Sequence, residues 1–158
     1  MTDALRDIRV VEFSDGCSAA FCGRLFARLG ADVVLIERPR TGSALRWEPP
    51  FLDNLAGIER SGLFMFSGSG KRSLTLDPSH ADGAPILRRL LERADVLIDE
   101  AGHSDAPMTA EVNPRLVRLA FRKFAAGGPY EKWLATELQL AALGGWMAQL
   151  GSRGGRRW

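Results

Sequence analysis

The stretch Ile8–Pro39 constrains the fold most, because it has the pattern of a strand, a turn, a helix and a second strand. Ile8–Phe13 is a short apolar run with β-branched residues, typical of a buried parallel strand. Apolar residues then recur at helical spacing, and we expect Ser18 to cap the start of this helix and Gly30 to end it. Ala31–Ile36 predicts the next strand. In such a unit, ligands bind at the loop after the first strand and at the end of the second.

The rest of the chain continues this alternation of strands and helices. We expect strands at Arg72–Asp77, Val96–Ile98 and Arg115–Phe121, and helices at Pro78–Ala94 and Trp133–Leu150, the last broken at Gly144-Gly145. Arg40–Arg60 has no period and indicates a long ordered loop. Leu63–Phe66 is a short helix or strand, followed by a flexible turn at Ser67–Gly70. The pattern predicts an α/β fold with a doubly wound, mainly parallel sheet and flanking helices, and a single domain over residues 1–158.

Composition and charge exclude several classes of protein. A net charge of +2 gives no argument for binding nucleic acid or a membrane surface. The sequence contains no apolar run of about 18 residues and no signal peptide, so we expect a cytoplasmic protein. Cys17 and Cys22 are poorly placed to bridge, and the histidines have no metal-ligand spacing with them, so we expect no disulfide and no metal.

Two glycine-containing segments are candidate anion sites. Ser14–Ser18 joins a strand to a helix, where backbone N–H groups face a ligand, but Gly16 alone does not make the three-glycine nicotinamide motif. Ser67–Ser73 departs from a nucleotide phosphate loop, since Met65 replaces a glycine and Arg72 replaces the metal-binding hydroxyl. Each segment therefore either allows a ligand to come close to the backbone or is a plain turn.

Near the first two strands, Arg38 and Cys17 are the side chains best suited to bind a ligand or to react with one. At the end of the second strand, Arg38 is placed to stack on an aromatic base or to bind a phosphate. The alternative is a surface ion pair with Glu37 or another neighbour. Cys17 lies at a helix start, but His80 and His103 are in distant polar stretches, so a structural cysteine is favoured over a nucleophile.

Six motifs together resemble the family III CoA-transferases, which include formyl-CoA transferases, carnitine CoA-transferases and α-methylacyl-CoA racemases. In chain order they are LRDIRVVEFS, GRLFARLGADVVLIERPRTGSALR, GKRSLTLD, ADVLIDE, VNPRLV and GGPY. The resemblance implies a large Rossmann-like domain with a small domain in a longer chain, and an interlocked homodimer. It implies that acyl-CoA and carboxylic acids are the substrates and that no cofactor is tightly bound. The family's catalytic aspartate is expected beyond Trp158, so the chain looks truncated and no catalytic residue is assigned.

The resemblance also implies which residues line a CoA site. They are Cys17, Ser18, Arg38 (stacking on adenine), Ser67, Gly68, Ser69, Gly70, Glu100, Ala101 and Gly102, with Thr136 and Glu137 matching the motif before the glycine pair. Glu100 stands where the family has asparagine, and an acid there would repel the CoA phosphates if it points at them. The expected function is CoA transfer between carboxylic acids, or acyl-CoA isomerisation. The alternative is a non-catalytic or degenerate module for CoA binding, nucleotide binding or dimerisation.

Overall fold

The computed structural model describes residues 3–100 and 112–149, and Ala101 and Gly102 therefore lie outside the described residues. The chain divides into two compact units, Met1–Phe121 and Arg122–Trp158, which are described separately below. None of the helices described is long and apolar enough to cross a membrane.

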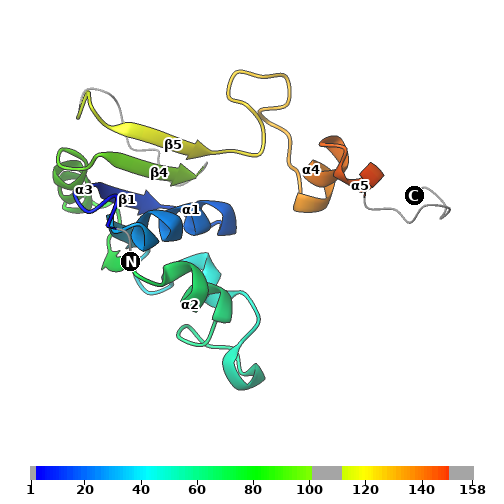
Figure 1. Ribbon diagram of the computed structural model, residues 1–158, viewed down its shortest axis with the longest axis horizontal. Coiled ribbons are helices and arrows are strands. Elements are labelled where there is room, and N and C mark those ends of the chain that lie inside the picture. The colour runs from blue at the N-terminus through cyan, green and yellow to red at the C-terminus, as the bar shows by residue number, and fades with distance from the viewer. Residues whose placement is uncertain (1–2, 101–111, 150–158) are drawn as a thin grey trace. The chain divides into compact units, whose positions relative to one another are not determined.

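Five parallel strands form the sheet of the first unit (Figure 1). They are β1 (Arg9–Phe13), β2 (Asp32–Glu37), β3 (Arg72–Thr75), β4 (Val96–Glu100) and β5 (Val117–Phe121), in the spatial order β3-β2-β1-β4-β5. The central β1 pairs with both β2 and β4, which are buried along most of their length, as is typical of a parallel sheet covered on both faces. The predicted α/β fold with a parallel sheet is confirmed.

Helices cover both faces of this sheet. The first unit contains α1 (Cys17–Arg28), α2 (Gly62–Gly68) and α3 (Gly83–Leu91). Val10 packs in one apolar cluster with Ala19 of α1, whereas its neighbour Val11 packs in the other cluster with Leu87 and Leu91 of α3. Since successive strand residues point to opposite faces, α1 and α3 lie on opposite sides of the sheet.

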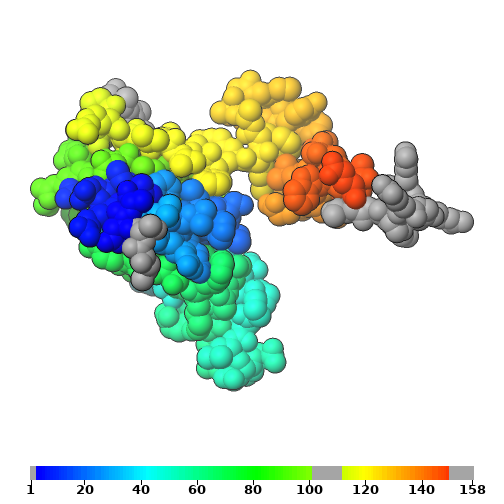
Figure 2. Space-filling view, viewed as in Figure 1, coloured from blue at the N-terminus to red at the C-terminus, as the bar shows by residue number. Residues whose placement is uncertain are grey.

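The loop after β2 is ordered, as its sequence predicts. It contains two short 3-10 turns, Ala44–Trp47 and Leu52–Asn54, and it extends beyond the layer of the sheet, as the cyan atoms of Figure 2 show. The buried hydroxyl of Ser61, at the start of α2, donates to the carbonyl groups of Leu45 and Glu48, each at 2.7 Å. These bonds fix the end of the loop to its middle.

Two sequence predictions about the ends of helices in this unit are wrong. Gly16 caps α1 in place of Ser18, which lies within the first turn of the helix. Ser67 and Gly68 are the last residues of α2 and do not form a flexible turn; Ser67 is buried, and its hydroxyl donates to the Leu63 carbonyl of the preceding turn at 2.8 Å. Glycine and serine favour turns on average, but here helical hydrogen bonding decides.

The predicted helix at Pro78–Ala94 is shorter in the structure. Before α3 begins at Gly83, the Asp77 carboxylate accepts hydrogen bonds from the backbone N–H and the hydroxyl of Ser79, at 2.9 and 2.6 Å. This local turn competes with the helix and delays its start.

Between residues 122 and 149, the second unit has two short helices, α4 (Glu137–Leu143) and α5 (Trp146–Gln149), which confirms the break at Gly144-Gly145. Helix α4 starts later than predicted, because Thr136 and Gln139 form a capping box, with side chain-to-backbone bonds of 2.7 and 3.4 Å. Upstream, the ring of Trp133 packs 4.6 Å from that of Tyr130, measured between centroids, outside any helix.

A buried ion pair ties β1 to α1 and to the start of β3. The side chain of Glu12 is fully buried, and its Oε1 and Oε2 atoms lie 2.9 and 2.7 Å from Nζ of Lys71. The same ammonium donates to the Ala20 carbonyl in α1 at 2.8 Å. Burial raises the pKa of Glu12 to about 7, although Lys71 and the Ser14 hydroxyl act in the opposite direction. Gly23 of α1 lies against this carboxylate, and a Cβ at that position would overlap Oε2.

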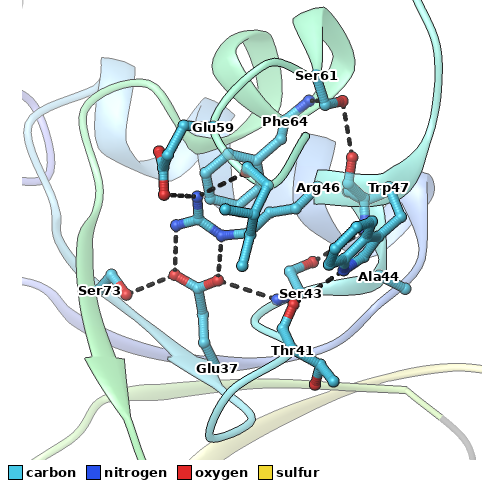
Figure 3. A network of polar contacts seen from close by, with 12 residues as sticks. Glu37, Thr41, Ser43, Ala44, Arg46, Trp47, Glu59, Ser61, Phe64 and Ser73 are labelled. Atoms are coloured by element: carbon cyan, nitrogen blue, oxygen red, sulfur yellow. Dashed lines mark hydrogen bonds and ion pairs between the residues drawn. The ribbon is translucent and has the colours of Figure 1, made fainter. Parts of the chain in front are cut away.

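A second buried carboxylate, that of Glu37, organises the loop after β2 (Figure 3). It accepts hydrogen bonds from Nε and Nη2 of Arg46 at 2.6 and 2.9 Å, from the Ser43 N–H at 2.9 Å and from the Ser73 hydroxyl at 2.5 Å. The Arg46 guanidinium also lies 3.7 Å from the centre of the Phe64 ring. Burial alone would raise the pKa of Glu37, but the bonds from Arg46, Ser73 and Ser43 together lower it to about 2.

Because Gly23 contacts Glu12, we expect alanine at position 23 to lower the stability of the fold, the opposite of its usual effect in a helix. Alanine in place of a helical glycine usually stabilises by about 1 kcal/mol. We expect Gly23→Ala instead to destabilise the fold by about 1–3 kcal/mol, since the new Cβ must displace the buried carboxylate. In the control Gly68→Ala, the new Cβ meets the Phe64 ring at an ordinary 3.5 Å, so stability is unchanged or higher. Urea unfolding of both variants measures this, and equal stabilities would contradict the packing described.

Glu37 predicts a loss of stability in acid. Its pKa is lowered from 4.5 in the unfolded chain to about 2 in the fold, so its contribution is complete above pH 4.5 and is lost as the pH falls through 2. The total is on the order of 3 kcal/mol. Between these pH values, the unfolding free energy of the wild type should fall more steeply than that of Glu37→Gln. Glu59→Gln, which changes the exposed partner of Arg46, should follow the wild type; if Glu37→Gln does so too, the assignment fails.

Candidate functional site

The carboxyl ends of β1, β2 and β4 meet at one edge of the sheet. From β1 the chain adds β2 and β3 on one side and β4 and β5 on the other, so the strand order reverses between β1 and β4. Ligands of open parallel sheets bind outside the carboxyl ends of the strands at this point of reversal. Asp15 and Gly16 follow β1, Arg38 follows β2, and Glu100 ends β4.

Glu100 bridges the point of reversal. Its Oε2 atom accepts the backbone N–H groups of Asp15 and Gly16, at 3.0 and 2.5 Å. A Cβ on Gly16 would overlap this carboxylate, so the close contact between Glu100 and the backbone requires glycine at position 16. The first N–H groups of a helix attract anions, and here the chain's own carboxylate accepts two N–H groups at the start of α1.

Arg38 lies at the same edge with its side chain about half exposed, at 53%. Its Nη2 atom is 3.5 Å from Oδ2 of Asp15, while Oδ1 of Asp15 accepts the Ala44 N–H at 2.9 Å. Glu37, the neighbour that the sequence offers first as an ion-pair partner, is bound by Arg46. Arg38 therefore presents a partly exposed guanidinium beside the loop that follows β1.

The remaining residues named from the sequence fall into two groups. Cys17, which is exposed, and Ser18 form the first turn of α1, next to Gly16 and at the carboxyl edge. The segment Ser67–Gly70 ends α2 and leads into the amino end of β3, at the opposite edge of the sheet. The structure brings the first group together with Arg38 and Glu100, and it does not bring the second there.

Thr136 and Glu137 belong to the second unit. The Thr136 hydroxyl caps α4, and Glu137 is the first residue of that helix, where a carboxylate favours the helix dipole. Both positions are explained by helix formation.

Sequence reasoning missed the polar partners that shape this edge. Asp15 lies in the segment predicted to join the first strand to the helix, yet its carboxylate pairs with Arg38 and accepts the Ala44 N–H. Asp99 is buried and accepts a hydrogen bond from Nε of Arg118 on β5 at 3.0 Å, so it joins two strands. The role of Arg46 cannot be predicted from a sequence pattern, because this residue lies in an aperiodic loop. Within residues 3–100 and 112–149, no group of three or more His, Cys, Asp or Glu side chains is placed to hold a metal.

Comparisons with known proteins agree with the fold. The chain is 29% identical over 161 residues to the succinate–glutarate CoA-transferase of Agrobacterium fabrum, covering 96% of this chain and 40% of that protein. It is 32% identical over 162 residues to a formyl-CoA:oxalate CoA-transferase of Rhodopseudomonas palustris, covering 98% and 37% respectively. The chain thus spans about 40% of the length of these relatives.

A solved structure and a family model extend the comparison. The crystal structure of a CAIB/BAIF family protein from Brucella suis superposes with a TM-score of 0.86 at 28% identity, over 100% of this chain and 43% of that one. The model of CoA-transferase family III matches residues 5–157. Because this match covers nearly all of the sequence, the chain belongs to CoA-transferase family III.

Proposed function

We propose that this chain binds CoA or an acyl-CoA at the carboxyl edge of its sheet, as part of a protein that transfers CoA between carboxylic acids. The observation that carries the proposal is the convergence of the loop after β1, Arg38 and Glu100 at the point where the strand order reverses. The relatives named above act on succinate and glutarate or on formyl-CoA and oxalate, so short carboxylic acids are the expected class of acceptor.

In this proposal Arg38 contacts the adenine of CoA. A planar guanidinium stacks well on an aromatic base, and the partial exposure of Arg38 leaves its face accessible. Cys17 and Ser18 lie beside it on the first turn of α1. The geometry does not support a role for Ser67–Gly70 in this site, because they lie at the other edge of the sheet.

Glu100 opposes binding of the CoA phosphates. In the position described, its carboxylate holds two N–H donors that could bind a phosphate group, and it adds negative charge beside Asp15. A diphosphate reaches these donors only if Glu100 moves away. This observation favours one alternative, a degenerate CoA- or nucleotide-binding module without catalytic activity.

The wider assembly is also part of the proposal. Family resemblance supports a homodimer in the cytoplasm. The second unit carries side chains suited to a protein interface, since Leu138, Leu143 and Trp146 are each about two-thirds exposed, at 66, 67 and 66%.

Titration calorimetry with CoA on the wild type and four variants tests the proposal. Arg38→Ala should bind CoA about 5- to 30-fold more weakly than the wild type, the equivalent of losing a cation–π contact of about 1–2 kcal/mol. Glu100→Asn should bind more tightly, because an amide does not repel phosphate and leaves N–H donors for it. Arg60→Ala, which removes a guanidinium paired with Asp53 in the loop, and Glu59→Gln are controls and should match the wild type.

The outcomes separate the alternatives. Equal affinities for the wild type and Arg38→Ala would remove Arg38 from the site. Binding by Glu100→Asn without binding by the wild type would favour the degenerate module. If neither the wild type nor Glu100→Asn binds CoA, the proposed function is wrong.

A further inference from the structure

A cavity of about 440 Å³ opens at the amino edge of the sheet, the edge opposite Arg38 and Glu100. The first residues of three strands, Arg9, Asp32 and Arg72, line one side of it. Arg89 and Arg93 line the other side, from the end of α3 and the residues that follow it. We refer to it as the arginine cavity. Its volume lies within the range of small-molecule pockets.

The charge in the arginine cavity is strongly unbalanced. Four arginines line it, with Asp32 as the one carboxylate among the lining residues. That carboxylate is already bound in a two-pronged pair by Arg72, with N–O distances of 2.8 and 2.6 Å. Its charge is thus compensated within the pair, and three guanidinium groups remain in excess.

Within the part of the chain that the structure describes, Arg9, Arg89 and Arg93 form no ion pair through their side chains. Arg89 lies near the end of α3, and Arg93 lies two residues beyond its last residue, Leu91. By contrast, Arg88 on the same helix pairs with Glu92 at 3.3 Å and does not line the cavity. The three unpaired arginines thus line the cavity together with the Arg72–Asp32 pair, whereas Arg88 does not.

The wall between the arginines is apolar. Val11, Val34, Leu90 and Ala94 contribute to the lining, and Val11 and Ala94 are buried in the core. A guanidinium binds carboxylate or phosphate through two parallel hydrogen bonds, and aliphatic side chains favour an apolar body beside them.

We propose that the arginine cavity binds a small organic anion, in which a carboxylate or phosphate group lies between Arg89 and Arg93 and an apolar part rests on the valine and leucine side chains. A concave site of this size suits a small molecule better than a nucleic acid, for which a net charge of +2 gives little attraction. The site is separate from the carboxyl edge and does not depend on the function proposed there.

Titration calorimetry with three probes tests the cavity. Phenyl phosphate and phenylacetate carry the two candidate anionic groups on the same ring, and benzyl alcohol carries the ring without a charge. We expect saturable binding of at least one anion, and binding about tenfold or more weaker in the Arg89→Gln, Arg93→Gln double variant. The double variant should fold, because it relieves repulsion between exposed side chains. The preferred anion identifies phosphate or carboxylate as the natural group.

The matched control removes the same charge outside the cavity. The Arg60→Gln, Arg88→Gln double variant should bind the anions within about twofold of the wild type, because neither residue lines the cavity. An equal loss in both double variants would overturn the proposal in favour of a general charge effect. Benzyl alcohol binding as tightly as the anions, or no saturable binding of either anion, would also overturn it. So would binding of poly-glutamate alone, which would make the cavity a docking surface for an acidic chain.

Discussion

The parallel pairing of β1 with both β2 and β4 is the constraint on which the site depends. Parallel strands all end at the same edge, so the carboxyl ends of β1, β2 and β4 meet there, whatever their sequences. Such a sheet needs cover on both faces, and the alternation of Val10 and Val11 between two apolar clusters supplies it through α1 and α3. The same topology pairs Arg9 with Asp32 at the other edge, and the side chain of Arg72 on β3 reaches Asp32 there. The two edges thus present different chemistry.

Two buried glutamates hold the loops and helices that surround this sheet, and their surroundings give them opposite pKa shifts. Glu37 accepts bonds from Arg46, Ser43 and Ser73, which offset its burial and lower its pKa to about 2. Glu12 lies deeper and has Lys71 as its main partner, so burial prevails and raises its pKa to about 7. Glu37 fixes the loop that follows Arg38, and Glu12 fixes α1 on β1. Removing either cation would leave a buried carboxylate without compensation.

Local pattern was enough to predict the sheet, the helix end at Gly30 and the break at Gly144-Gly145, because each follows from periodicity or from glycine conformation. Gly30 and Gly145 indeed have positive φ angles of 100° and 77°. The cap of α1 could not be predicted, since Gly16 is required by Glu100, which lies far away in sequence. The pairing of Glu37 with Arg46 also depends on the path of an aperiodic loop. The position of Ser67–Gly70 depends on where α2 ends. The serines and glycines favour a turn, so the sequence does not predict that the helix extends to Gly68.

The proposed CoA site lies at the carboxyl edge of the sheet, beside the start of α1. Amide hydrogen exchange of the wild-type protein with and without saturating CoA tests it most directly, because it locates the ligand along the backbone. The account predicts slower exchange at residues 14–18 and 38–46, with no change at residues 67–72. Slower exchange at residues 67–72 with an unchanged carboxyl edge would contradict it and move the site to the other end of the sheet.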